Sequence, residues 1–147
     1  MCYSDITALY GARDIDKKVW PYQSNENAIE YPVITGLVIW LTSLPVDNYQ
    51  SFFYLNIFLL ALLLIAVSLL IYRIRAEFVP LCLLAPAVIA SLYINWDMWA
   101  VLGAILAIYL FKERRFDYSA IALGVAIATK FFPIVLLIPV ALFFLNQ

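Results

Sequence analysis

Residues 51–72 read SFFYLNIFLLALLLIAVSLLIY and contain no charged side chain. A helix of this length extends about 33 Å at 1.5 Å per residue, and the hydrocarbon core of a bilayer is about 30 Å thick. The stretch therefore predicts a transmembrane helix. It determines how the rest of the chain is interpreted.

The composition of the whole chain agrees with a membrane protein. Of its 147 residues, 66% are hydrophobic and 13% are charged, whereas soluble domains average about 45–50% and about 25%. A soluble chain of this size could not bury so much apolar surface. We therefore expect an integral membrane protein whose first partner is the lipid bilayer.

The charged and sulfur-containing residues exclude several classes of function. A net charge of −1 is unfavourable for binding nucleic acid, which requires a basic surface. The chain has no histidine, so histidine-based catalytic triads and histidine-bound metals are excluded. Cys2 and Cys82 match no metal-ligand spacing and are not expected to form a disulfide. We expect no cofactor; a divalent ion shared by Asp5 and Asp97 stays open as a weak case.

Four more apolar segments follow residue 72, and charged residues separate them. Together they predict an all-α fold, a multi-span transmembrane bundle of five helices at 51–72, 78–94, 98–111, 118–129 and 133–145. Residues 1–50 predict an extracytoplasmic loop that carries short interfacial helices. The apolar segment 32–44 in this loop is too short to span a bilayer, so we expect it to lie in the interface.

The positive residues orient the predicted bundle. Five of the nine Lys and Arg residues fall in the loops 73–77 and 112–117, and loops rich in these residues face the cytoplasm. Alternation places residues 1–50 and the turns at 95–97 and 129–133 on the extracytoplasmic side. Four ionisable residues would then share that side: Asp5, Glu30, Asp97 and Lys130.

The segment around Lys130 allows two interpretations. Residues 118–145 could form one kinked span with Lys130 inside the membrane, or two shorter pieces joined by a tight turn. An unpaired lysine in lipid is costly, and Pro133 follows three residues later. We favour the turn.

Short motifs occur in a fixed order along the chain: Tyr3-Ser4-Asp5, Leu9-Tyr10, Arg13, Pro21-Tyr22, Glu30-Tyr31-Pro32-Val33-Ile34-Thr35-Gly36, Asn95-Trp96-Asp97 and Thr129-Lys130-Phe131-Phe132-Pro133. In this order they resemble glycosyltransferase family 87, which contains polyprenyl-phosphate-mannose-dependent α-mannosyltransferases. The earlier motifs resemble that family's first extracytoplasmic loop. The last two resemble its Asn-Trp-Asp and Thr-Lys-aromatic-Pro elements.

The resemblance implies a C-type glycosyltransferase of the bacterial plasma membrane. Such an enzyme would transfer a hexose, mannose in this family, from a polyprenyl-phosphate sugar to a glycolipid or glycan acceptor of the cell envelope. The family's catalytic carboxylate matches Asp5, which would accept the proton of the attacking hydroxyl while the anomeric centre inverts. Lys130 and Arg13 are the cations that would stabilise the leaving phosphate.

Each of these residues also has a plainer interpretation. Asp5 could be a solvated loop acid, and Asp97 could cap the helix that follows it, with or without a role in the site. Glu30 could pair with Arg13 or Lys17, or contact the acceptor. Six aromatic residues are expected mainly to form an interfacial belt, with one or two stacking on sugar: Trp20, Tyr22, Tyr31, Trp40, Trp96 and Trp99.

The chain departs from the family in length. Family members are much longer and begin with a transmembrane helix ahead of the loop that carries the carboxylate. We therefore expect an N-terminal fragment of such an enzyme, inactive alone. Two other classes stay open: a non-enzymatic membrane subunit or scaffold, in which Asp5, Asp97 and Lys130 need not meet, and a transporter, which the absence of internal repeats disfavours.

Overall fold

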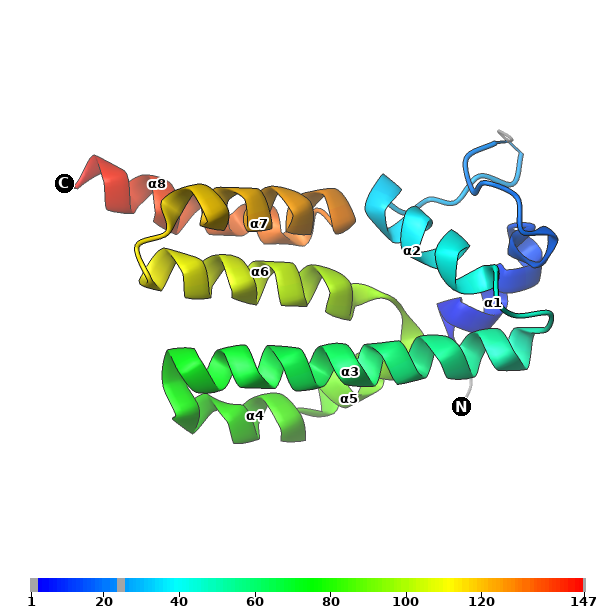
Figure 1. Cartoon of the computed structure of the whole chain (residues 1–147), viewed down its shortest axis with the longest axis horizontal. Coiled ribbons are helices and arrows are strands. Elements are labelled where there is room, and N and C mark those ends of the chain that lie inside the picture. Colours follow the sequence, from blue (N-terminus) through cyan, green and yellow to red (C-terminus); the bar gives the residue numbers. More distant parts are fainter. Residues whose placement is uncertain (1–2, 24–25, 147) are drawn as a thin grey trace.

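The computed structural model describes residues 3–23 and 26–146. This part of the chain is all-helical, with 78% helix and no strand (Figure 1). The eight α-helices described are α1 (Asp5–Ala12), α2 (Val33–Ser43), α3 (Tyr49–Arg75), α4 (Val79–Leu84), α5 (Pro86–Ile94), α6 (Asp97–Lys112), α7 (Phe116–Thr129) and α8 (Leu137–Leu145). Three short 3-10 turns join them: η1 (Ile15–Lys17), η2 (Ala76–Phe78) and η3 (Phe132–Leu136). Cys2 lies outside the described residues.

Helix α3 is longer at both ends than the uncharged stretch that predicts it. The Asn48 side chain caps its first turn by accepting a hydrogen bond from the Ser51 backbone N–H at 2.9 Å. Arg73 and Arg75 lie in its last turn, where positive charge complements the helix dipole. By length and composition, the described residues hold one helical segment able to cross a membrane, and it lies within Tyr49–Leu84.

The predicted helix 78–94 is two helices, and the prediction of one continuous segment is wrong. Helix α4 ends at Leu84 and α5 begins at Pro86, with Ala85 between them in an extended conformation (φ −65°, ψ 119°). Proline clashes with a helical residue before it, so the chain breaks at Ala85.

The chain reverses direction at Lys130. Helix α7 ends at Thr129, Lys130 is extended (φ −156°, ψ 144°), and α8 runs back beside α7 (Figure 1). The ring of Phe116, at the start of α7, lies 5.3 Å from the ring of Phe144, near the end of α8. Residues 118–145 therefore form two antiparallel pieces instead of one kinked helix.

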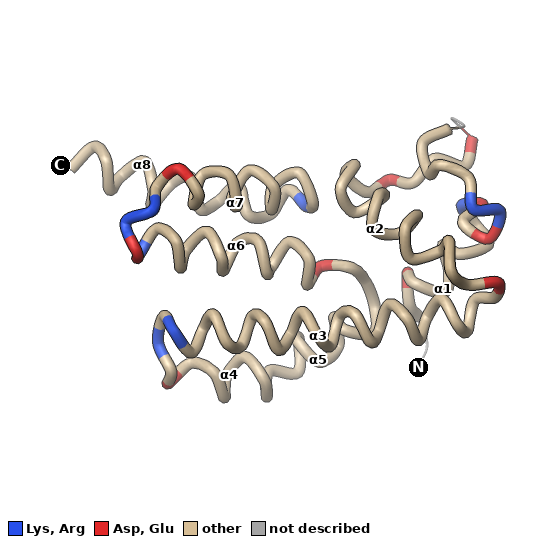
Figure 2. The backbone as a smooth tube through the Cα atoms, viewed as in Figure 1, with Lys and Arg blue, Asp and Glu red and all other residues tan. Residues whose placement is uncertain are grey.

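The charged residues gather at the two ends of the helical bundle (Figure 2). The loops 73–77 and 112–117 lie together at one end, where the Lys112 ammonium donates hydrogen bonds to the backbone oxygens of Arg73 and Ile74 at 3.1 and 3.0 Å. The N-terminal segment, the start of α6 at Asp97 and the end of α7 before Lys130 lie at the other end. The two basic loops therefore share one end of the bundle, and the N-terminal segment lies at the other.

The core sits where α1 and α3 meet the start of α6. Phe52 and Trp96 are buried there, and the ring of Tyr10 packs 4.9 Å from that of Phe52. Farther along the bundle, α6 and α7 approach closely, because a Cβ on Gly103 would lie 2.9 Å from the Cβ of Ala126. Small residues at such a contact permit close helix packing. The opposite face of α3 stays exposed and apolar at Tyr54, Phe58, Leu62, Ile65 and Leu69.

Candidate functional site

An open cavity of about 510 Å³ lies at the end of the bundle away from the basic loops. Three segments that are far apart in sequence form its walls. They contribute Tyr3, Asp5, Leu9, Glu30, Tyr31, Pro32, Lys130, Phe131 and Phe132. The structure thus brings the predicted carboxylate and the predicted phosphate-binding lysine to one cavity.

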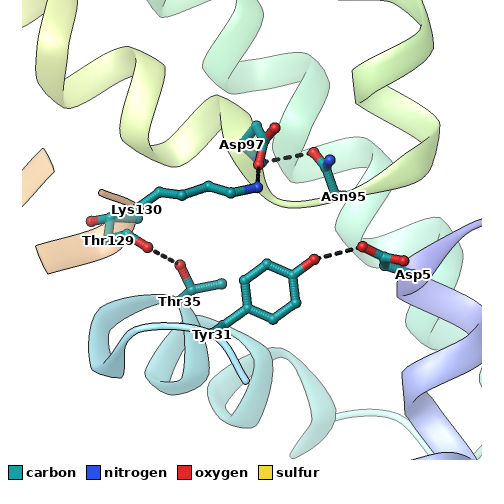
Figure 3. Close-up of polar contacts among 7 residues, drawn as sticks. All are labelled: Asp5, Tyr31, Thr35, Asn95, Asp97, Thr129 and Lys130. Carbon is teal, nitrogen blue, oxygen red and sulfur yellow. Dashed lines mark hydrogen bonds and ion pairs between the residues drawn. The ribbon is translucent and has the colours of Figure 1, made fainter. Parts of the chain in front are cut away.

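Tyr31 holds the carboxylate of Asp5. Asp5 is the first residue of α1, and the Tyr31 hydroxyl donates a hydrogen bond to its Oδ2 atom at 2.6 Å (Figure 3). Burial, and then this hydrogen bond to a carboxylate, raise the pKa of Tyr31 far above its usual value. The phenol therefore stays protonated at neutral pH and remains a hydrogen-bond donor.

Lys130 forms an ion pair with Asp97 (Figure 3). Asp97 opens α6 but does not cap it, so the prediction of a capping role for its side chain is wrong. The Asn95 side chain takes that place and accepts the Asp97 backbone N–H at 3.1 Å. The Asp97 carboxylate is therefore available to Lys130, whose ammonium lies 5.4 Å from the centre of the Tyr31 ring. Asp5, Tyr31, Lys130 and Asp97 form one continuous polar chain.

Two further contacts fix the walls of the cavity. The Thr35 hydroxyl of α2 donates to the Thr129 carbonyl of α7 at 2.6 Å, and both side chains are buried (Figure 3). The Tyr22 hydroxyl lies 2.8 Å from the Tyr31 carbonyl oxygen, and its ring packs so tightly on Gly36 that a Cβ there would come within 2.6 Å of ring carbons. Tyr22 therefore supports the backbone of the site and does not line the cavity.

Arg13 and Glu30 form an ion pair at the rim. Glu30 lines the 510 Å³ cavity, whereas Arg13 lines a separate cavity of about 340 Å³. Lys17 pairs instead with Asp14 at 2.9 Å, which settles the partner of Glu30 in favour of Arg13. Among the described residues, Lys130 is the one cation that lines the cavity with Asp5.

Sequence reasoning missed a buried polar contact behind the site. Trp96 is 1% exposed, so its assignment to an interfacial belt is wrong. Its indole N–H donates to the Asn56 side-chain oxygen at 2.7 Å, and its ring packs edge-on against Tyr31 with centroids 5.8 Å apart. The signal was present, because Asn56 is a solitary amide within the uncharged stretch 51–72.

The site offers a proton acceptor, a proton donor and a cation around one cavity. Within the described residues, no three His, Cys, Asp or Glu side chains are grouped to hold a metal ion. Asp5 is engaged by Tyr31 and Asp97 by Lys130. Comparisons with models of known families, with curated proteins and with solved structures find no match to this chain.

Proposed function

We propose that the chain is a multi-pass protein of the bacterial plasma membrane whose extracytoplasmic cavity transfers a sugar. The reaction would move a hexose, mannose by resemblance, from a polyprenyl phosphate to a hydroxyl of a glycolipid or glycan acceptor, with inversion. One observation carries the proposal. Asp5 and Lys130, near opposite ends of the sequence, line the same open cavity at the end away from the basic loops.

Asp5 acts as the general base. Tyr31 donates to Oδ2, the Tyr3 hydroxyl is also a partner of this carboxylate, and Asp5 accepts the proton of the acceptor hydroxyl as its oxygen attacks the anomeric carbon. The bond from that carbon to the phosphate oxygen breaks, and the phosphate leaves with the electron pair. Asp5 then passes the proton to water. A positioned base contributes about 10²–10⁴ in rate.

Lys130 stabilises the leaving phosphate. An ammonium group has three N–H donors, and Asp97 is the one carboxylate that forms an ion pair with it among the described residues. The remaining donors can bind a phosphate oxygen in the cavity while Asp97 and the Tyr31 ring hold the ammonium in place.

The membrane location rests on the apolar surface and the ordering of charge. The exposed stripe on α3 would face lipid, and the two basic loops would lie in the cytoplasm. Labelling of single-cysteine variants in intact cells tests this. Glu30→Cys should react with an impermeant maleimide and Arg115→Cys should react only after lysis. The opposite pattern, or a chain that does not sediment with membranes, would reject the location.

The reaction is tested with membranes that contain a full-length version of the predicted enzyme that includes this chain, radiolabelled polyprenyl-phosphate mannose and a membrane glycolipid acceptor. We expect Asp5→Asn to lower transfer by about 10²–10⁴ and Lys130→Gln by about a hundredfold. Asp16→Asn and Lys17→Gln are matched controls, because these residues lie outside the cavity. Absence of transfer by the full-length version, or full activity of its Asp5→Asn variant, would overturn the proposal, whereas the present chain alone is expected to be inactive.

A further inference from the structure

We propose that the basic end of the bundle binds an anionic phospholipid, with one acyl chain in a groove between α6, α7 and α8 and the phosphate on Arg114 and Arg115. This site lies at the end opposite the 510 Å³ cavity, so it does not depend on sugar transfer. It rests on the proposed membrane location, which the labelling experiment above tests by itself.

The groove is apolar along its length. A cavity of about 270 Å³ lies between α6 (Phe111), α7 (Ser119, Leu123) and α8 (Val140), and a second cavity of about 150 Å³ shares these four residues. The one polar side chain on their walls is Ser119, and its hydroxyl donates to the Ala107 carbonyl at 2.8 Å. A ligand inside the groove finds no polar side chain left to bind, so it must be a hydrocarbon.

One cation, Arg114, lies near the end of the groove. The second cavity reaches Phe116 and Phe144, and Phe144 packs 5.3 Å from Phe143. The Arg114 guanidinium lies 5.8 Å from the centre of the Phe143 ring. Within the described part of the chain, neither Arg114 nor Arg115 forms an ion pair.

Arg114 lies in the turn that closes α6, where the Arg115 backbone N–H donates to the Leu110 carbonyl at 2.9 Å. Its φ of 62° lies in the left-handed region, which residues other than glycine adopt at a cost. The turn nevertheless carries an arginine there, and the next residue is a second arginine. Two arginines in succession offer two guanidinium groups to one phosphate, because each presents a planar fork of donors.

The two halves of the site identify the ligand by chemistry. A free phosphate would use the arginines and leave the groove empty, and a neutral lipid would use the groove and leave the arginines unmatched. An anionic phospholipid uses both. Basic pockets between helices at the cytoplasmic surface are known sites for acidic lipid headgroups.

Native mass spectrometry of the full chain in neutral detergent tests the proposal, with phosphatidylglycerol and phosphatidylcholine as probes. We expect phosphatidylglycerol to bind more tightly than phosphatidylcholine. The double variant Arg114→Gln with Arg115→Gln should weaken phosphatidylglycerol binding roughly thirtyfold, since each Lys or Arg near the lipid surface contributes about fivefold to the affinity. The control pair Arg73→Gln with Arg75→Gln removes equal charge at the same end and should change binding less than threefold. Equal binding of both lipids, or equal loss in the control pair, would overturn the proposal.

The groove is tested separately from the charges. Val140→Trp should fill both cavities and weaken phosphatidylglycerol binding about tenfold, whereas Ile138→Trp, at an exposed position of α8 outside the groove, should not. Excess glycerol phosphate should fail to compete. As a measurement that needs no variant, phosphatidylglycerol with a photoreactive acyl chain should label α7 and α8. Labelling spread over the exposed face of α3, or competition by glycerol phosphate, would reject the groove.

Discussion

The hydrogen bond between Asn56 and Trp96 gives the sharpest test of how the site is held. Both side chains are about 1% exposed, and the indole N–H lies 2.7 Å from the amide oxygen. Asn56 also donates to the Phe52 carbonyl at 2.9 Å within α3. Asn56→Leu keeps the number and branching of the side-chain heavy atoms and leaves the indole N–H without this acceptor.

The expected cost follows from that orphaned donor. A buried polar group without a partner costs about 1–3 kcal/mol, so we expect Asn56→Leu to lower the free energy of unfolding by about 2 kcal/mol. The direct coupling is smaller. Hydrogen bonds between helices in membrane proteins average about 0.6 kcal/mol and reach about 1.7. Because this bond is short and buried at both ends, we expect a coupling of about 1 kcal/mol between Asn56→Leu and Trp96→Phe.

The assay is unfolding of the purified chain in mixed micelles with a denaturing detergent, followed by far-ultraviolet circular dichroism. Asn56→Leu, Trp96→Phe and the double variant complete the mutant cycle. Ser68→Ala is the matched control, because within the described residues the Ser68 hydroxyl bonds only to the Leu64 carbonyl of its own helix, and the change should cost under about 0.5 kcal/mol. A coupling indistinguishable from zero would refute the assignment of Asn56 as the partner that fixes Trp96.

Two further outcomes are expected. Gly103→Val should destabilise the chain by about 2 kcal/mol, because the valine side chain would overlap Ala126. Gly124→Ala, at a helical glycine with open space around it, should stabilise the chain by about 1 kcal/mol. Chemical unfolding measures both variants, and equal effects would contradict the close contact of α6 and α7. The pKa of Tyr31 is raised in the folded chain, so as the pH rises through about 10 the Tyr31 hydroxyl loses its proton first in the unfolded state. Above that pH the free energy of unfolding should therefore fall by as much as about 1.4 kcal/mol per pH unit. Tyr31→Phe should remove this part of the fall in a pH series of unfolding curves, and Tyr49→Phe at an exposed position should not.

The sequence predicted the segments of this fold better than their breaks. The uncharged stretch 51–72 and the capping residue Asn48 are local features of the sequence, so the position of α3 agrees with the hydropathy. The break at Ala85 is also local, because Pro86 forbids a helical residue before it. The prediction of one helix over 78–94 missed this break because it included both Pro80 and Pro86 in a single apolar segment. The turn at Lys130 was favoured on the cost of a charge in lipid, and the hairpin of α7 and α8 has that charge at its apex.

The partners of the site residues could be predicted only in part. The predicted topology puts Asp5 and Lys130 on the same side of the bundle, but it does not predict which acidic side chain each cation pairs with. That choice depends on side-chain reach: Arg13 meets Glu30, Lys17 meets Asp14, and Lys130 meets Asp97. The prediction that Arg13 and Lys130 act on one phosphate therefore finds no support in the geometry, because Arg13 lines another cavity.

Tyr31 joins three side chains from different elements into one site. Its hydroxyl donates to Asp5, the face of its ring lies under the Lys130 ammonium, and its ring makes a T-shaped contact with that of Trp96. No local pattern assigns three contacts to one tyrosine, because each partner comes from a different element. The buried bond from Trp96 to Asn56 ties this tyrosine to the longest helix. The amide that looks out of place in an apolar stretch thus has a physical reason to be there, since it fixes the wall against which the polar chain of the cavity is built.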